Sequence, residues 1–175
     1  MRALGLAALL TVCSAGCSAA PQPAPSTAPQ PDKSGFTTIA CAESIDTVPR
    51  PPDDRRVVGG EVALPAADVV EPADSGRPAP LRLFAKWALL VRGGATVRIT
   101  VAPGWTDRGW VGWGQPGEPS TAVQLTGCPA TDGAEAWSVF AGGSWVTDPA
   151  CVPLLVEAGG ETARLDVAIG KPCRK

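Results

Sequence analysis

Four Gly-Gly pairs punctuate the chain after residue 36 and constrain its fold more than any other feature. They lie at 59–60, 93–94, 142–143 and 159–160, between short runs rich in Val, Leu, Ile and Trp. Two-residue glycine loops suit the type I′ and II′ turns of β-hairpins, because those turns need positive φ angles. No apolar repeat of helical period is long enough to compete. The sequence therefore predicts an all-β fold.

The hairpin around Gly159-Gly160 has a register that follows from pairing residues outward from the turn. Leu155 falls opposite Arg164 and Glu157 opposite Thr162, which gives a mixed face. The other face carries three apolar pairs: Val152 with Val167, Leu154 with Leu165 and Val156 with Ala163. One apolar face and one mixed face are what a half-buried hairpin requires.

The remaining strands follow from the same pattern. We expect residues 95–101, which alternate, to pair with the apolar run 87–91 across Gly93-Gly94. Around Gly142-Gly143 we expect Val139 to pair with Val146 and Phe140 with Trp145. Further strands are predicted at 121–125 and 110–113, and Pro153 should place its strand at an edge or a bulge. Seven or eight strands favour an antiparallel β-sandwich, immunoglobulin-like or a related Greek key.

The first seventeen residues have the pattern of an export signal. Arg2 precedes an apolar run from Ala3 to Val12, and Ser14-Ala15-Gly16 leads directly into Cys17. This stretch resembles a bacterial lipobox, although most lipoboxes have Leu, Val or Ile where this chain has Ser14. The resemblance implies removal of residues 1–16 and a diacylglycerol on Cys17. We therefore expect a lipoprotein anchored at the extracellular face of the cell membrane.

The residues after Cys17 divide into a tether and one domain. Residues 17–35 are rich in Pro and Ala and have no apolar periodicity, which is typical of a disordered tether. Residues 36–175 are enough for a single domain with a real core, and we expect a monomer. The formal net charge of −2 provides no basic surface for nucleic acid, which we exclude as a partner.

Four cysteines remain for the exported domain: Cys41, Cys128, Cys151 and Cys173. Four cysteines allow three pairings in an oxidising compartment. Cys151 lies opposite Ala168 in the predicted hairpin, so Cys173 is too far along the chain to reach it unless the tail folds back. We therefore favour Cys128 with Cys151 and Cys41 with Cys173.

The chain contains no histidine, and this restricts its chemistry. It lacks the usual general base of serine and cysteine hydrolases and the commonest zinc ligand, and no cysteine pair has the C-x-x-C spacing. We expect no metal, no cofactor and no catalytic residue. A carboxylate-dependent wall hydrolase is a remote alternative, for which the candidates are Asp132, Glu135, Asp148, Glu157 and Asp166.

Three of the six tryptophans lie within nine residues, at Trp105, Trp110 and Trp113. A glycine-rich loop that carries three indoles could stack on sugar rings, with Asp107 and Arg108 bonding to the hydroxyls. The competing interpretation is that these indoles fill the core of a small sandwich. We assign Trp87 and Trp137 to the core, whereas Trp145 could lie on either side of its strand.

The last third of the chain resembles small actinobacterial lipoproteins of unknown function. The resemblance rests on Trp137 to Gly143, Pro149 to Leu154 and Ile169 to Cys173, within the stretch from Cys128 onward, together with the hairpin from Lys86 to Val101. It implies an exported β-protein and brings no catalytic or binding residue with it.

The sequence thus predicts a non-enzymatic, lipid-anchored surface protein that acts as a binding or interaction module. Its partner would be a cell-envelope protein or a glycan, and the alternative is specific binding of a wall polysaccharide by the tryptophan loop.

Overall fold

The computed structural model describes residues 35–66, 69–115, 117–130 and 135–173. The predicted signal peptide, the lipidation site Cys17 and the tether up to residue 34 lie outside the described residues. Within the described part, the single helix is a short 3₁₀ turn, Cys41–Glu43. None of the described segments is a helix with the length and hydropathy needed to cross a membrane.

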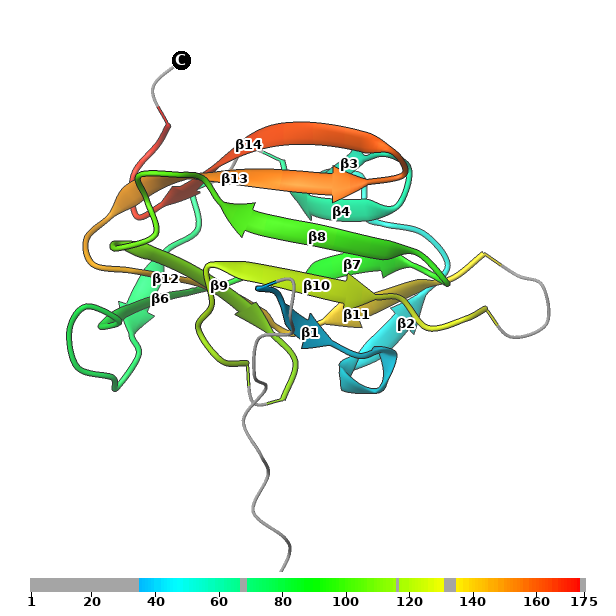
Figure 1. Cartoon of the computed structure of the whole chain (residues 1–175), viewed down its shortest axis with the longest axis horizontal. Coiled ribbons are helices and arrows are strands. Elements are labelled where there is room, and N and C mark those ends of the chain that lie inside the picture. The colour runs from blue at the N-terminus through cyan, green and yellow to red at the C-terminus, as the bar shows by residue number, and fades with distance from the viewer. Residues whose placement is uncertain (1–34, 67–68, 116, 131–134, 174–175) are drawn as a thin grey trace, which may run out of the picture.

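The strands in the described ranges form three sheets (Figure 1). The first sheet contains, in spatial order, β1 (Thr37–Ile39), β10 (Ala122–Thr126), β8 (Thr96–Val101), β13 (Ala150–Ala158) and β14 (Glu161–Ile169). The second contains β2 (Asp46–Val48), β11 (Trp137–Phe140), β7 (Leu89–Arg92), β4 (Val62–Pro65) and β3 (Arg55–Val58). The third contains β5 (Pro72–Asp74), β6 (Leu83–Lys86), β12 (Gly142–Val146) and β9 (Gly109–Trp113).

The second and third sheets form one bent layer that packs against the first sheet. The chain runs from β6 into β7 through Trp87-Ala88 and from β11 into β12 through Ala141, and the Trp87 amide donates to the Gly142 carbonyl at 2.9 Å across the bend. The inner faces of all three sheets share one apolar core. The protein is an all-β sandwich, as the sequence predicts. It has fourteen described strands, more than expected, because the bends divide long strands and short strands add to the edges.

The β13–β14 hairpin has the predicted register in every pair, including Cys151 opposite Ala168. Gly159 and Gly160 have φ angles of 55° and 75°, the conformation that a tight hairpin turn needs. This hairpin is local in sequence, so its own pattern is enough to determine its register.

The predicted pairing across Gly93-Gly94 is wrong. β7 pairs with β4 and β11 in the second sheet, whereas β8 pairs with β10 and β13 in the first, so the chain crosses between layers here. The alternation expected for β8 is confirmed, since Val97, Ile99 and Val101 are buried. Gly93 allows a close backbone approach: a Cβ there would lie 2.7 Å from the Cys128 carbonyl oxygen.

The predicted hairpin at Gly142-Gly143 is also wrong. β11 and β12 belong to different sheets and pair with other strands, so neither Val139–Val146 nor Phe140–Trp145 forms. A Cβ on Gly142 would lie 2.1 Å from the Gly112 carbonyl oxygen, and one on Gly143 would lie 2.0 Å from that of Ala85. These two glycines do not form a turn; they allow neighbouring strands to approach closely at the bend.

Pro153 does not place its strand at an edge, because β13 lies between β14 and β8. The β8 ladder ends at the pair Leu154–Val101, and beyond it the Ala102 amide donates to the Pro153 carbonyl at 2.9 Å. In an antiparallel pair, the N–H and C=O of one residue point to the same side. The missing N–H of Pro153 therefore faces Ala102 just beyond the end of β8, so proline removes only the reciprocal bond of this last pair.

The favoured cysteine pairing is wrong: the disulfides are Cys41–Cys128 and Cys151–Cys173. β1 runs parallel to β10, and its last residue, Ile39, lies opposite Leu125. Cys41 and Cys128 therefore follow the two strands at the same end of the sheet. At the other end, the tail does fold back after β14. Gly170 has a φ of 63°, and Cys173 comes within a Cα–Cα distance of 5.1 Å of Cys151.

Two matching Gly-Gly-Glu turns join the two layers at one end of the sandwich. The Glu161 carboxylate accepts a hydrogen bond from the Gly59 amide at 3.1 Å, and the Glu61 carboxylate accepts one from the Gly159 amide at 2.6 Å. A Cβ on Gly59 would lie 2.1 Å from the Ala158 carbonyl oxygen. We call this reciprocal contact between residues 59–61 and 159–161 the glycine clasp.

Candidate functional site

The structure separates the three tryptophans of the predicted site. Trp113 is 1% exposed and points into the core from β9. Its ring packs edge-on against Trp87, with centroids 4.8 Å apart, and its indole N–H donates to the Trp87 carbonyl at 3.3 Å. Trp113 is therefore a core residue and cannot contact a ligand, and Trp87 lies in the core as predicted.

Trp137 is buried but does not belong to the main core. It lies on β11 on the face opposite Phe140 and packs with Ala63 and Leu90 in a separate cluster on the outer side of the second sheet. The burial predicted for Trp137 is confirmed, but its place in the main core is not. Its indole packs on the outer face of the bent layer.

Trp110 lies on the outer face of the third sheet, in line with two further aromatic side chains. Strand alternation puts Val111 and Trp113 inside, so Trp110 faces outward. Trp110 is directly opposite Trp145 of β12, and Trp145 is directly opposite Phe84 of β6. The Phe84 and Trp145 rings are 4.5 Å apart between centroids and tilted by 36°. We call Phe84, Trp145 and Trp110 the aromatic row.

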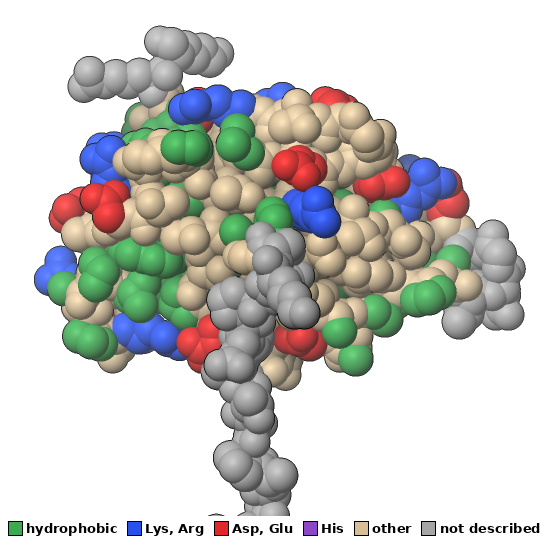
Figure 2. All heavy atoms as spheres, in the orientation of Figure 1, with side chains coloured by type: hydrophobic (Ala, Val, Ile, Leu, Met, Phe, Trp, Pro, Cys, Tyr) green, Lys and Arg blue, Asp and Glu red, His purple; other side chains and the backbone are tan. Residues whose placement is uncertain are grey.

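The aromatic row crosses three neighbouring strands that are spaced by about 4.8 Å, so it forms a continuous apolar stripe. Phe84 and Trp110 are half-buried, whereas Trp145 between them is 5% exposed. Figure 2 shows hydrophobic side chains gathered at the left end of the view, where Figure 1 places β6, β9 and β12. The first sheet has polar residues on its outer face, including Arg98 and Gln124.

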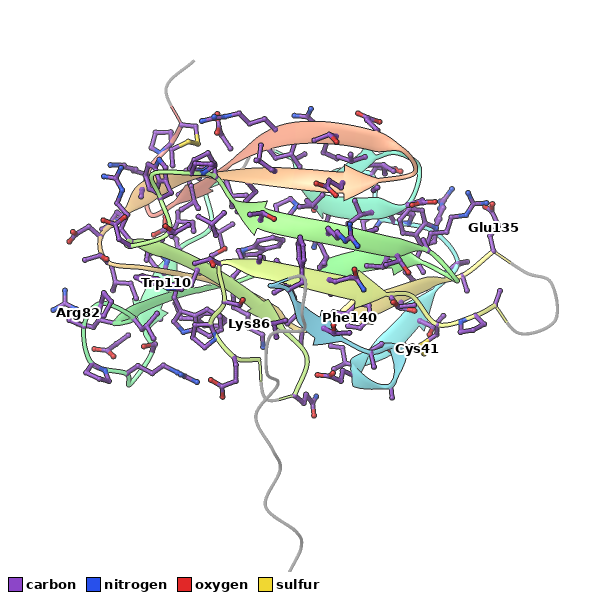
Figure 3. All side chains as sticks on the ribbon, in the orientation of Figure 1. Cys41, Arg82, Lys86, Trp110, Glu135 and Phe140 are labelled. Atoms are coloured by element: carbon purple, nitrogen blue, oxygen red, sulfur yellow. A yellow bond between two sulfur atoms is a disulfide. The ribbon has the colours of Figure 1, made fainter. Side chains whose placement is uncertain are left out.

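A pocket of about 250 Å³ opens on the aromatic row. Phe84 and Trp145 line it together with Lys86, and its other walls are small: Gly114, Gly117, Ala141 and Gly142. Because glycine carries no side chain, these walls leave the half-buried Phe84 ring open to a flat ligand, and the buried Trp145 ring packs against it. Figure 3 labels Lys86 and Trp110 on this part of the molecule.

Charged groups of both signs surround the aromatic row. The Arg77 guanidinium lies 5.9 Å from the Trp145 ring centroid and pairs with Glu118 at 3.2 Å. Lys86 is exposed beside Phe84. The Glu43 carboxylate lies against Gly114, since a Cβ there would meet Glu43 Oε2 at 2.1 Å. Hydrogen-bond donors and acceptors thus border an apolar floor, the arrangement that suits a polyhydroxylated ring.

Trp105, Arg108 and Asp107 do not join this pocket. Trp105 is half-buried against the core, and the Arg108 guanidinium lies 4.2 Å from its ring centroid. Both residues line a different hollow of about 170 Å³. Asp107 is exposed and lines neither of these two pockets.

The candidate catalytic carboxylates are dispersed. Asp132 lies outside the described residues. Glu135 pairs with Arg92, Glu157 pairs with Arg98 at 3.9 Å and Asp166 pairs with Arg164 at 3.6 Å, while Asp148 lines the hollow beside Trp105. The part of the chain that the structure describes contains no group of three or more acidic or cysteine side chains placed to hold a metal ion.

A hollow of about 560 Å³ lies at the bend of the second layer beside Arg55 and Trp87. The Arg55 guanidinium donates to the Ala88 carbonyl at 2.9 Å, and its Nε has no hydrogen-bond partner among the described residues. Its lining includes Ala66 and Val69, the described residues on either side of the undescribed positions 67–68, so we assign no site to it.

Phe84, Lys86 and Trp145 are the large side chains that line the pocket, yet Trp145 lies far from the other two in the sequence. Phe84 and Lys86 are separated from Trp145 by about sixty residues, and only the β6–β12 pairing makes them neighbours. One signal for the pocket lies in the strand that contains Trp145. Side chains alternate along a strand, so if Ser144 and Val146 face the core, Trp145 faces outward.

Comparison with protein-family models, curated protein sequences and solved structures finds no match to this chain.

Proposed function

We propose that this chain is a non-enzymatic, lipid-anchored protein of the outer face of the cell membrane that binds a cell-wall glycan on the aromatic row. The observation that carries the proposal is the alignment of Phe84, Trp145 and Trp110 across three strands, with a pocket of about 250 Å³ on it. The apolar faces of sugar rings pack on aromatic side chains, and polar groups at the edge bond to the hydroxyls.

The size of the pocket favours one ring of a longer chain as the bound unit. Its volume lies just below the range of about 300–1,000 Å³ that holds drug-sized ligands. The row continues from the pocket to Trp110, so a second ring of the same polysaccharide could pack there. Lys86, Arg77 and Glu118 supply both donors and acceptors for hydroxyl groups.

The anchor proposed at Cys17 supports the same function. A tether rich in proline extends by about 3.1 Å per residue, so a chain of this length would hold the domain up to roughly 50 Å from the membrane, within the wall layer. Cys17→Ser should move the protein from the membrane fraction to the medium, and mass spectrometry of the native protein should find diacylglycerol on Cys17. An unmodified Cys17 in membrane-extracted protein would contradict the proposed anchor. It would not affect the proposal that the aromatic row binds a glycan.

The glycan proposal is tested by binding of purified wall polysaccharide, measured by affinity gel electrophoresis. Phe84→Ala and Trp110→Ala should each weaken retardation by about tenfold, a loss equivalent to about 1.4 kcal/mol. The matched control is Gln124→Ala, on the polar outer face of the first sheet, which should bind like the natural protein. Thermal unfolding of each variant confirms that the fold is intact.

Equal retardation of all four proteins, or none with any wall polysaccharide, would overturn the glycan proposal. Capture of a specific envelope protein under those conditions would favour a protein partner instead.

A further inference from the structure

The hollow beside Trp105 has a chemistry of its own and shares no lining residue with the pocket on the aromatic row. It measures about 170 Å³, and the segments that form it are the 105–108 turn, the 147–150 turn and the tail around Lys171. This volume lies below the range of about 300–1,000 Å³ that holds drug-sized ligands. A ligand of this size is a single small metabolite.

Trp105 and Arg108 form one wall in a fixed arrangement. The indole packs against the core, and the Arg108 guanidinium lies 4.2 Å from its ring centroid. One guanidinium nitrogen donates to the Gly104 carbonyl at 3.2 Å, and the Thr147 amide donates to the Arg108 carbonyl at 3.3 Å. A guanidinium has five N–H donors, so most of them remain for an anion.

Lys171 lines another side of the hollow, in a tail that the Cys151–Cys173 disulfide fixes to β13. β14 ends at Ile169, and the Gly170 amide donates to the Val70 carbonyl at 3.0 Å. Two residues after Lys171, Cys173 is bonded to Cys151 at the start of β13. The tail is thereby tied down on both sides of Lys171, an exposed residue that lines the hollow.

The charges around the hollow are unbalanced and unpaired. Arg108 and Lys171 are cations, Asp148 is an anion, and none of the three takes part in an ion pair among the described residues. A purely anionic ligand such as phosphate would bond to the two cations but would leave Asp148 without a partner. A small zwitterion satisfies all three groups, because its carboxylate faces the two cations while its ammonium donates to Asp148.

We propose that this hollow binds a free α-amino acid with a small side chain. Its carboxylate is held between Arg108 and Lys171, its ammonium is bonded to Asp148, and its side chain packs on Trp105. Binding is non-covalent and takes place independently of the glycan site.

Three related compounds test the proposal on the purified protein: alanine, N-acetylalanine, which lacks the ammonium, and alaninamide, which lacks the carboxylate. The readout is the NMR shift of the Trp105 indole N–H, assigned with Trp105→Phe. Alanine should shift this signal in a saturable way, with an affinity at least fivefold higher than that of either analogue.

Variants separate the two charge contacts. Lys171→Ala should weaken both alanine and N-acetylalanine by at least fivefold, whereas Asp148→Asn should weaken alanine alone. Lys86→Ala, which removes the cation beside the aromatic row, is the matched control and should leave alanine binding unchanged. Equal shifts with all three compounds, or no shift up to the solubility of alanine, would overturn the proposal. Neither result would affect polysaccharide binding by the aromatic row.

Discussion

Gly59→Ala should destabilise the protein far more than Gly60→Ala, although the two glycines are adjacent in one turn. Both have positive φ angles, 56° and 69°, so a Cβ costs each about 1–2 kcal/mol of backbone strain. At Gly60, nothing lies within 4 Å of the added Cβ. At Gly59, the Cβ would meet the Ala158 carbonyl oxygen at 2.1 Å, so the two turns of the glycine clasp must separate.

The extra cost at Gly59 has two parts. Overpacking at a tight contact costs about 1–3 kcal/mol. Separation of the turns also weakens the hydrogen bonds from the Gly59 and Gly159 amides to the two glutamates, each contributing about 0.5–1.5 kcal/mol. If both bonds are lost, the two parts sum to about 2–6 kcal/mol, so Gly59→Ala should lose at least about 2 kcal/mol more than Gly60→Ala.

The assay is urea denaturation followed by tryptophan fluorescence, with the mirror pair Gly159→Ala and Gly160→Ala as a repeat in the other layer. Gly159 is as constrained as Gly59, since its Cβ would lie 2.2 Å from the Gly59 carbonyl oxygen. If the free energies of unfolding of the two variants in either pair agree within about 0.5 kcal/mol, the clasp does not hold the layers together as described.

Two further stability predictions follow from the disulfides and the bend. Replacing both Cys41 and Cys128 by alanine should cost about 4.5 kcal/mol of stability, because this bond spans 87 residues. Replacing both Cys151 and Cys173 should cost about 3.5 kcal/mol, because that bond spans only 22. Urea denaturation without reductant measures both costs, and the reverse order would contradict the chain-entropy argument. Ser144→Ala should cost about 1–3 kcal/mol, because it leaves the buried indole N–H of Trp87 without the acceptor that lies 3.1 Å away. A loss within the experimental error of thermal unfolding would mean that this N–H finds another acceptor at the bend.

The sequence predicts the fold where partners are close along the chain. The β13–β14 register depends on a two-residue turn and a period of two, and both can be read within twenty residues. The Gly-Gly pairs at 93–94 and 142–143 look the same in sequence, yet there the glycines allow close approach of distant backbone, at Cys128 and at Gly112. A glycine pair can form a tight turn or allow close approach of another strand. Which of the two it does depends on residues far away in the sequence, so the local pattern does not show it.

The same limit explains the cysteines and the candidate site. The parallel pairing of β1 with β10 joins segments more than eighty residues apart, and without it the Cys41–Cys128 bond cannot be foreseen. Of the three tryptophans between 105 and 113, Trp110 is the one that lies on the outer face of the third sheet, opposite Trp145. Alternation along β9 sends Trp110 outward and Trp113 inward, and the aromatic neighbours of Trp110 come from β12 and β6.

The most direct test of glycan binding on the aromatic row is an NMR titration of the six indole N–H signals with purified wall polysaccharide. The account predicts saturable shifts for Trp110 and Trp145 and none for Trp87, Trp113 or Trp137, which lie in the core or in the separate outer cluster. Shifts confined to Trp105, or no shift of any indole while the polysaccharide is bound, would contradict it.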